Sequence, residues 1–211
     1  MARHTFFSFH YERDAWRASQ VRNSNMIPCE DEYGFVDAAE WEEIKRKGNP
    51  AIEAWIAQQL DHTSVTAVLI GAETADREWV RHEIVESWNR GNGLVGIWIH
   101  NIKDQDSKTD TMGRNPFNEI LLPNGTSLSS VCKTYDWIND GRNNLGTWIE
   151  EAYQNRRVQS SDLIKKGSGL AAAAIAAAAV TAAVIASKHR QPAPTVFRPR
   201  APWCDIDANR R

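Results

Sequence analysis

The chain has 211 residues, 42% of them hydrophobic and 25% charged, which provides enough apolar material for one substantial core in a soluble globular domain. Its formal net charge of −2 argues against a general nucleic-acid-binding protein, because such proteins present a basic face. Three widely separated cysteines without a C-x-x-C pair favour a reducing compartment and give no indication of a zinc or other metal site.

Strands and helices alternate along the chain in the order expected of a parallel sheet with helical crossovers. The strands are predicted at residues 4–9, 33–36, 65–70, 94–100 and 131–137. The helices are predicted at residues 12–23, 38–47, 50–60, 77–90 and 145–157. Polar residues 101–116 are predicted to form a mobile loop near the site. The predicted fold class is α/β, an open flavodoxin-like parallel sheet of about five strands with helices on both faces.

The third predicted strand, residues 65–70, is β-branched and apolar without polar alternation. A strand with one face in water would alternate, so both faces of this one are predicted to be covered by helices. Capping oxygens and negative charge in residues 73–76 then precede the amphipathic helix 77–90. Open α/β sheets place their chemistry at strand-to-helix corners of this kind.

Two residues of the predicted helix 77–90 stand out, Trp79 and Glu83, because a spacing of four places them one turn apart. The other acids of this helix, Glu78 and Glu86, have basic partners at helical spacing, whereas no base stands three or four residues from Glu83. The pattern favours a functional carboxylate. The alternative, a solvated carboxylate on the helix surface, stays open because such pairing is worth only about 0.2–0.5 kcal/mol.

Four segments appear in a characteristic order along the chain. They are Phe6-Phe7-Ser8-Phe9-His10-Tyr11, Gly34-Phe35-Val36-Asp37-Ala38, Val68-Leu69-Ile70-Gly71 and Trp79-Val80-Arg81-His82-Glu83-Ile84. This ordered set resembles the TIR-like proteins of bacterial anti-phage defence, and most closely the TIR subunit of Thoeris systems. The resemblance extends over about residues 3–155, and it implies a TIR-like version of the open parallel sheet.

The resemblance also implies an activity, with NAD as substrate and no separate cofactor. TIR domains of this kind break the bond between nicotinamide and ribose with a glutamate four residues after a tryptophan, which here is Glu83. Thoeris TIR subunits answer phage infection by making a cyclic ADP-ribose-type messenger that activates a separate effector protein. The implied partners are therefore NAD, that effector, a phage-derived trigger and further copies of the chain.

A single carboxylate is chemically sufficient for this reaction. Ordinary glycoside hydrolysis uses two carboxyl groups because an alkoxide leaving group must be protonated. In NAD the nicotinamide is already a cationic pyridinium and departs neutral, so one anion beside the ribose can stabilise the cationic transition state. The product then depends on whether water or the folded-back ADP half reaches the ribose first.

Weaker candidates for substrate binding lie around the predicted site. Open sheets receive phosphate and ribose at the end of the first strand, where the sequence places Ser8, Phe9, His10 and Tyr11. Asp37 ends the second predicted strand, although it could equally cap the following helix. The Trp79 side chain, like those of Phe9 and Tyr11, could line the substrate site or could belong to the hydrophobic core. No G-x-G-x-x-G follows the first strand, which argues against hydride transfer.

Two readings besides the enzyme remain open. In the first, the chain is a non-catalytic TIR adaptor or sensor that assembles on infection, and Glu83 stabilises an interface. In the second, the chain is another flavodoxin-like module, such as a relative of nucleoside deoxyribosyltransferases, and prefers nucleosides to NAD.

The C-terminal part departs from the compact family pattern. Residues 167–187 are uncharged and alanine-rich, and as a helix they would be roughly 32 Å long, close to the thickness of a bilayer core. The predicted bounds are a TIR-like domain at 1–158, a linker at 159–169, an apolar helix at 170–187 and a disordered Pro/Arg tail at 188–211. We expect the helix to anchor a cytoplasmic TIR domain to the inner membrane, where its small residues would favour self-association. The alternative is a soluble alanine-rich helix packed on another subunit. No signal-peptide pattern follows Met1.

Overall fold

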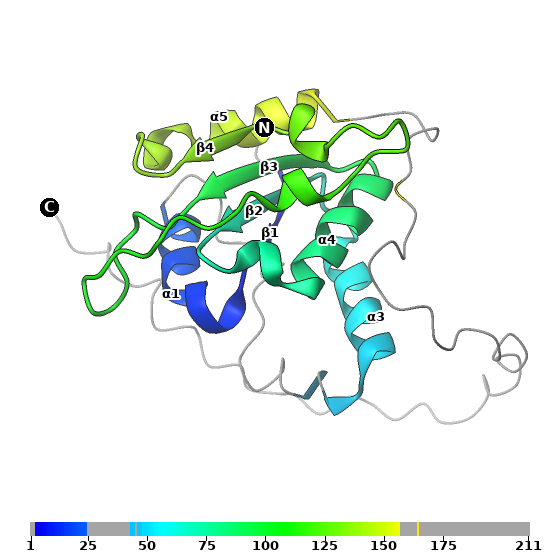
Figure 1. Cartoon of the computed structure of the whole chain (residues 1–211), viewed down its shortest axis with the longest axis horizontal. Helices are drawn as coiled ribbons and strands as arrows, with labels where there is room; N and C mark the ends of the chain where they lie inside the picture. Colours follow the sequence, from blue (N-terminus) through cyan, green and yellow to red (C-terminus); the bar gives the residue numbers. More distant parts are fainter. Residues whose placement is uncertain (1–2, 25–42, 45, 157–163, 165–211) are drawn as a thin grey trace, which may run out of the picture. The chain divides into compact units, whose positions relative to one another are not determined.

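A computed structural model describes residues 3–24, 43–44, 46–156 and 164 of the chain. These residues form a four-stranded parallel sheet with helices on both faces (Figure 1). The strands are β1 (Thr5–Ser8), β2 (Val65–Ile70), β3 (Gly93–Trp98) and β4 (Thr134–Asp136), and they lie side by side in chain order. The helices are α1 (Tyr11–Arg22), α3 (Asn49–Leu60), α4 (Glu78–Asn89) and α5 (Gly141–Gln154). Short 3-10 turns are η1 (Thr74–Asp76), η2 (Pro116–Glu119) and η3 (Leu128–Ser130).

The α/β class and the parallel sheet predicted from the sequence are confirmed. Four of the five predicted strands and four of the five predicted helices are present, with ends that differ by a few residues. The predicted strand 33–36 lies outside the described residues, as does most of the predicted helix 38–47. A flavodoxin-like sheet has the strand order 2-1-3-4-5. The four described strands match the 1-3-4-5 part of this order.

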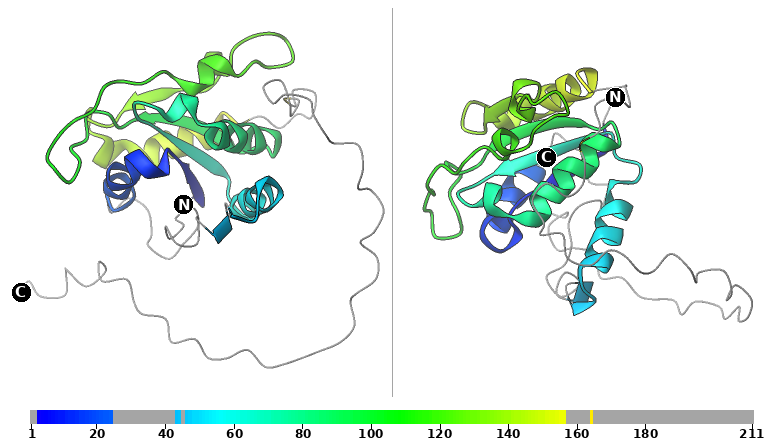
Figure 2. Two further views of the ribbon diagram at one scale, coloured as in Figure 1. Left: turned by 60° about the horizontal axis from the view of Figure 1, so that its bottom comes forward. Right: turned by 45° about the vertical axis from the view of Figure 1, so that its right-hand side comes forward.

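The two faces of the sheet are covered by different helices. On one face, α1 and α5 pack against alternate side chains of the strands, among them Phe7, Leu69 and Ile97. On the other face, α4 packs with η2 and η3 against Val68 and Ile70. A third cluster joins α3 to Phe6 of β1. Helices α4 and α5 therefore lie on opposite faces of the sheet (Figure 2).

Strand β2 is the central support of this arrangement. It pairs with β1 through the register Ser8↔Val68 and with β3 through Ile70↔Trp98, and all of its residues are buried. This burial on both faces explains the continuous apolar run of residues 65–70, and it confirms the prediction made for that strand. Because the strands are parallel, their carboxyl ends meet at one edge of the sheet.

The polar segment 101–116 follows β3 at that edge. The Arg13 guanidinium of α1 donates to both carboxylate oxygens of Asp110, at 2.8 and 2.9 Å. The buried Arg17, one turn further along α1, donates to the backbone carbonyl of Ile102 at 2.9 Å. These contacts place the segment beside α1, while its predicted mobility and its predicted nearness to the site stay predictions.

Ile164, described without its neighbours, packs on the α4 face of the sheet. The Asn89 side chain of α4 accepts a hydrogen bond from the Ile164 backbone N–H at 2.8 Å and donates to its carbonyl at 3.0 Å. None of the described helices is long and apolar enough to cross a bilayer. The predicted apolar helix 170–187 and the tail 188–211 lie outside the described residues, so the anchor and the domain bounds stay predictions.

Candidate active site

Glu83 lies on α4, a little more than one turn after the helix begins, and it reaches back to the first strand. The turn between β2 and α4 is built around Thr74, whose buried hydroxyl accepts from the Gly71 N–H at 2.9 Å and donates to the Leu69 carbonyl at 3.3 Å. This turn lets α4 begin close to the carboxyl end of β2. The predicted strand-to-helix corner is therefore present.

The Ser8 side chain, at the end of β1, meets Glu83 directly. Its hydroxyl donates a hydrogen bond of 2.5 Å to Oε2 of Glu83, and the two residues are 75 positions apart in the chain. Ser8 is fully buried and Glu83 is 8% exposed. The structure thus brings together two of the residues that the sequence singled out.

Burial has a large effect on the proton affinity of Glu83. Desolvation raises the pKa of the Glu83 carboxyl from an ordinary value of 4.5 to about 8, and the hydrogen bond from Ser8 opposes part of that rise. At neutral pH the free protein therefore holds this glutamate mostly as the neutral acid. Shifted pKa values cluster at functional sites, and buried structural carboxyl groups show them as well.

Trp79 lies one turn before Glu83 and is half-buried. It packs against the cluster that joins α3 to Phe6, and its ring meets the His82 ring edge-on with centroids 5.7 Å apart. The side chain therefore belongs at least partly to the core, which is one of the two alternatives that the sequence left open.

The structure places the other predicted residues after β1 in different surroundings. His10 is buried beside Glu12 and Glu73, with ring nitrogens 3.8 and 3.9 Å from their carboxylates, and desolvation lowers its pKa. Phe9 packs instead against the α1/α5 cluster, on the face opposite α4, and its ring lies 6.2 Å from that of Tyr11. Asp37 lies outside the described residues. The structure therefore does not bring Phe9 to Glu83, and the substrate-binding roles of these residues stay predictions.

A buried charge pair on α1 was missed by the sequence analysis. Asp14 is fully buried against Gly71, where desolvation raises its pKa to about 6, and Arg17 lies 3.5 Å away. Both residues share the buried stripe of α1 with Ala18 and Val21. Two charges on an apolar helical stripe, three residues apart, are the signal that could have identified the pair.

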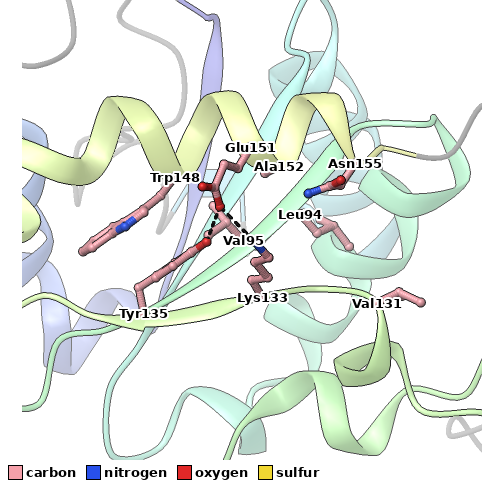
Figure 3. A pocket seen from close by; sticks show the side chains of 9 residues that line it. All are labelled: Leu94, Val95, Val131, Lys133, Tyr135, Trp148, Glu151, Ala152 and Asn155. Carbon is pink, nitrogen blue, oxygen red and sulfur yellow. Dashed lines mark hydrogen bonds and ion pairs between the residues drawn. The ribbon is translucent and has the colours of Figure 1, made fainter.

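A hollow lies away from Glu83, between α5, β3 and β4. It has a volume of about 220 Å³, including space open to solvent, and Tyr135 stacks on Trp148 at one end of it. In Figure 3 both Tyr135 and Lys133 reach Glu151, to which they donate hydrogen bonds of 2.5 and 3.1 Å. These bonds lower the pKa of Glu151, and the bond from Tyr135 has the larger effect. Because α5 covers the face opposite α4, this hollow is separate from the Glu83 site.

Metal-binding geometry is not found in the described part of the chain, where no three His, Cys, Asp or Glu side chains gather in a suitable group. The chemistry available at the site is that of one buried carboxyl group, held by a serine at the carboxyl edge of a parallel sheet. Such a group can stabilise a developing positive charge once it is ionised.

Comparisons with known proteins agree with this architecture. The family model described as Thoeris protein ThsB, TIR-like domain, matches residues 6–104, a span that runs from β1 past β3 and contains Ser8 and Glu83. A relative from Bacillus cereus (strain MSX-D12) bears the name "Putative cyclic ADP-D-ribose synthase ThsB1". It is 32% identical to this chain, and the match covers 71% of this chain and the whole of the relative. The resemblance found in the sequence is confirmed, and the chain belongs to the family of Thoeris ThsB proteins with a TIR-like domain.

Proposed function

We propose that this chain is an anti-phage defence enzyme that cleaves NAD at the nicotinamide–ribose bond and releases a cyclic ADP-ribose-type messenger. The observation that carries the proposal is the placement of Glu83, a buried carboxyl group at the carboxyl edge of the sheet with a pKa of about 8. Its position four residues after Trp79 and the name of the relative support the same activity.

The reaction requires Glu83 in its ionised form. As the bond between C1′ of the ribose and the nicotinamide nitrogen breaks, its electron pair stays on the nitrogen, and nicotinamide leaves as a neutral molecule. The positive charge moves to the ribose, where the Glu83 carboxylate stabilises it. Attack on C1′ by a nitrogen of the adenine base closes a ring, whereas attack by water gives linear ADP-ribose.

The cationic nicotinamide of the substrate itself favours ionisation of Glu83. A positive charge near a carboxyl group lowers its pKa, whereas in the free protein desolvation is the largest influence and raises it. A bound NAD molecule therefore supplies a counter-charge beside Glu83, and the carboxylate forms where it is needed.

The partners proposed on the same basis are NAD, an effector protein reached through the nucleotide messenger, a phage-derived trigger and other copies of the chain. These partners are supported by the family membership of the chain alone. His10, Tyr11, Asp37 and Trp79 are proposed to line the NAD site, and Ser8 to support it through its hydrogen bond to Glu83. Phe9 is the weakest of the predicted contacts because it packs on the other face of the sheet.

The test compares wild type, Glu83→Gln and Glu86→Gln in cells before and during phage infection, with mass spectrometry of their small molecules. Glu86 is a matched control because it lies on the same helix and pairs with Arg90. We expect an infection-dependent ADP-ribose isomer in wild type and Glu86→Gln that Glu83→Gln does not produce. Phage protection that survives Glu83→Gln without any new nucleotide would contradict catalysis.

An adaptor role is the second candidate, and one observation favours it. A neutral, buried Glu83 bonded to Ser8 also fastens α4 to β1, as a purely structural residue would. In that case Glu83→Gln would weaken assembly, measured by size-exclusion chromatography from infected cells, while no variant would turn over NAD.

A further inference from the structure

The Ser8–Glu83 contact has a geometry that a substrate-binding serine does not need. Ser8 lies in the last position of β1, in register with Val68 of β2, so its Cα is fixed by the central part of the sheet. The side chain is fully buried and its hydroxyl donates to Glu83 over 2.5 Å. A hydroxyl enclosed in this way is turned to the glutamate and has no exposed surface to offer a ligand.

Glu83 uses only one of its two carboxyl oxygens in this contact. Among the described residues, Ser8 is the single group that donates a hydrogen bond to Glu83, and it does so to Oε2. Oε1 accepts no hydrogen bond from the described residues. It is nevertheless not one of the fully enclosed side-chain atoms that lack a partner. The small exposed surface of Glu83 is therefore consistent with Oε1 being the oxygen that a ligand can reach.

Burying a glutamate side chain is unfavourable unless other interactions compensate for it. Glutamate loses rotamer freedom on burial, and a buried ionised carboxyl group without a donor is strongly unfavourable. A rigid hydroxyl at the end of a strand supplies the donor and selects one orientation of the side chain. Positioning groups of this kind hold a catalytic side chain within a fraction of an ångström of its working geometry.

We propose that Ser8 is a positioning residue that acts through Glu83, fixing its Oε2 against the end of β1 and leaving Oε1 for the substrate. The catalytic part of this role rests on the proposed function, in which Glu83 is the reacting carboxylate. It replaces the direct substrate contact that the sequence suggested for Ser8. The bond from Ser8 also favours the ionised form of Glu83 over the neutral acid.

The pKa of Glu83 offers a direct readout of this bond. The two influences on it are desolvation, which raises it, and the Ser8 hydroxyl, which lowers it. Other titratable groups on the elements around Glu83 include His10 after β1, Glu53 on α3, Arg77 before α4, and Glu78, Arg81, His82 and Glu86 on α4. None of these groups is a cause of the shift, so loss of the hydroxyl should appear as a further rise.

The chain provides a matched control for the experiment. Thr66 of β2 donates to the hydroxyl of Ser87 of α4 at 2.8 Å, and both residues are fully buried. Ser87→Ala therefore removes a buried hydroxyl tie between a strand and α4, as Ser8→Ala does, without touching Glu83. A merely structural role for Ser8 predicts the same behaviour from the two variants.

The experiment titrates Glu83 in the full chain by NMR with carbon-13-labelled glutamate, assigned by comparison with Glu83→Gln. We expect Ser8→Ala to raise the titration midpoint by about one pH unit, since a hydrogen bond to a charged group is worth roughly that much. Ser87→Ala should leave the midpoint unchanged. Ser8→Cys, which keeps a weak donor, should give a smaller rise and serves in place of Ser8→Ala if that variant does not fold.

Activity supplies an independent measurement. If NAD is cleaved, kcat/KM of Ser8→Ala should fall about tenfold at pH 7 and recover towards pH 10, following the ionised fraction of Glu83. A midpoint unchanged in Ser8→Ala and Ser8→Cys, or shifted equally in Ser87→Ala, would overturn the positioning role. If wild type never cleaves NAD, the proposed function fails, and the titration still decides whether Ser8 controls Glu83.

Discussion

Glu83 illustrates the cost of placing a carboxyl group where its charge is poorly solvated. Its pKa is about 8 in the folded protein against an ordinary value of 4.5. The folded state thus keeps a proton that the unfolded chain releases between about pH 4.5 and pH 8. Over that interval, ionisation of the unfolded chain favours unfolding, so the contribution of Glu83 to stability falls as the pH rises.

Glu83→Gln keeps the size of the side chain but removes the loss of stability that Glu83 causes as the pH rises. We expect the variant to melt at about the same temperature as wild type at pH 4.5, where both side chains are neutral. At pH 8.5 we expect it to be more stable than wild type by on the order of a few kcal/mol. Thermal unfolding followed by circular dichroism at the two pH values measures the difference. An equal gap at both values would mean that Glu83 is not buried as described.

At the scale of elements, α1 and β2 meet through a contact that depends on a glycine. A Cβ at Gly71 would lie 2.2 Å from the nearer carboxylate oxygen of the buried Asp14. The first turn of α1 can therefore approach the carboxyl end of β2 only because residue 71 has no side chain. This approach also places α1 beside the edge of the sheet where Glu83 lies.

Gly71→Ala is expected to lower the free energy of unfolding by about 1–3 kcal/mol, because the methyl group overpacks a filled interior. Since the clash is with a side chain, Asp14→Ala in the same chain should relieve much of that loss. Gly93→Ala is the contrasting case, because its Cβ would meet the Ala152 backbone carbonyl at 2.4 Å. Urea unfolding of the single and double variants measures the coupling, and strict additivity of Gly71→Ala and Asp14→Ala would contradict the contact.

An ion pair between Arg13 and Asp110 holds residues 101–116 against α1. The Arg13 guanidinium donates two hydrogen bonds to the Asp110 carboxylate, and this contact lowers the pKa of Asp110 to about 2. The stabilisation is present above the ordinary pKa of an aspartate and is lost as the pH falls through about 2. It is modest in size because much of the Arg13 side chain is in contact with solvent.

Asp110→Asn is expected to speed amide hydrogen exchange in residues 104–113 by about fivefold at pH 7, which corresponds to about 1 kcal/mol of lost local stability. Asp106→Asn, in the exposed part of the same segment, should leave the exchange unchanged. Mass spectrometry of the exchanged peptides compares the two variants. Equal exchange in both would show that the Arg13 contact does not hold the segment.

For the whole molecule, the sequence predicted the sheet better than the site. The uninterrupted apolar run 65–70 indicated a strand covered on both faces, and periodicity located the helices on either side of it. Contacts between distant residues were harder to predict, since nothing local in Ser8 indicates that it will meet a glutamate 75 positions later. Alternation along β1 does imply that Ser8 and Phe9 face opposite sides, and this could have separated them as site residues.

Ile164 extends the core beyond the last helix in a way that the sequence did not reveal. It is 8% exposed in the cluster around α4, and its backbone is held by Asn89. We expect Ile164→Ala to lower the free energy of unfolding by about 2 kcal/mol, at the low end for a buried isoleucine. Ile138→Ala, at a residue 64% exposed, should change it by less than about 0.5 kcal/mol. Similar urea midpoints for the two variants would place Ile164 outside the cooperative unit.

If NAD binds beside Glu83 as proposed, the protonation of that carboxyl group makes NAD binding depend on pH. At pH 7, a carboxyl group with a pKa of about 8 carries its proton in about nine of ten molecules. On the proposed mechanism, the cationic nicotinamide displaces that proton when NAD enters the site. Substrate capture is then accompanied by release of a proton to the solvent, and its affinity increases with pH until Glu83 is already ionised in the free protein.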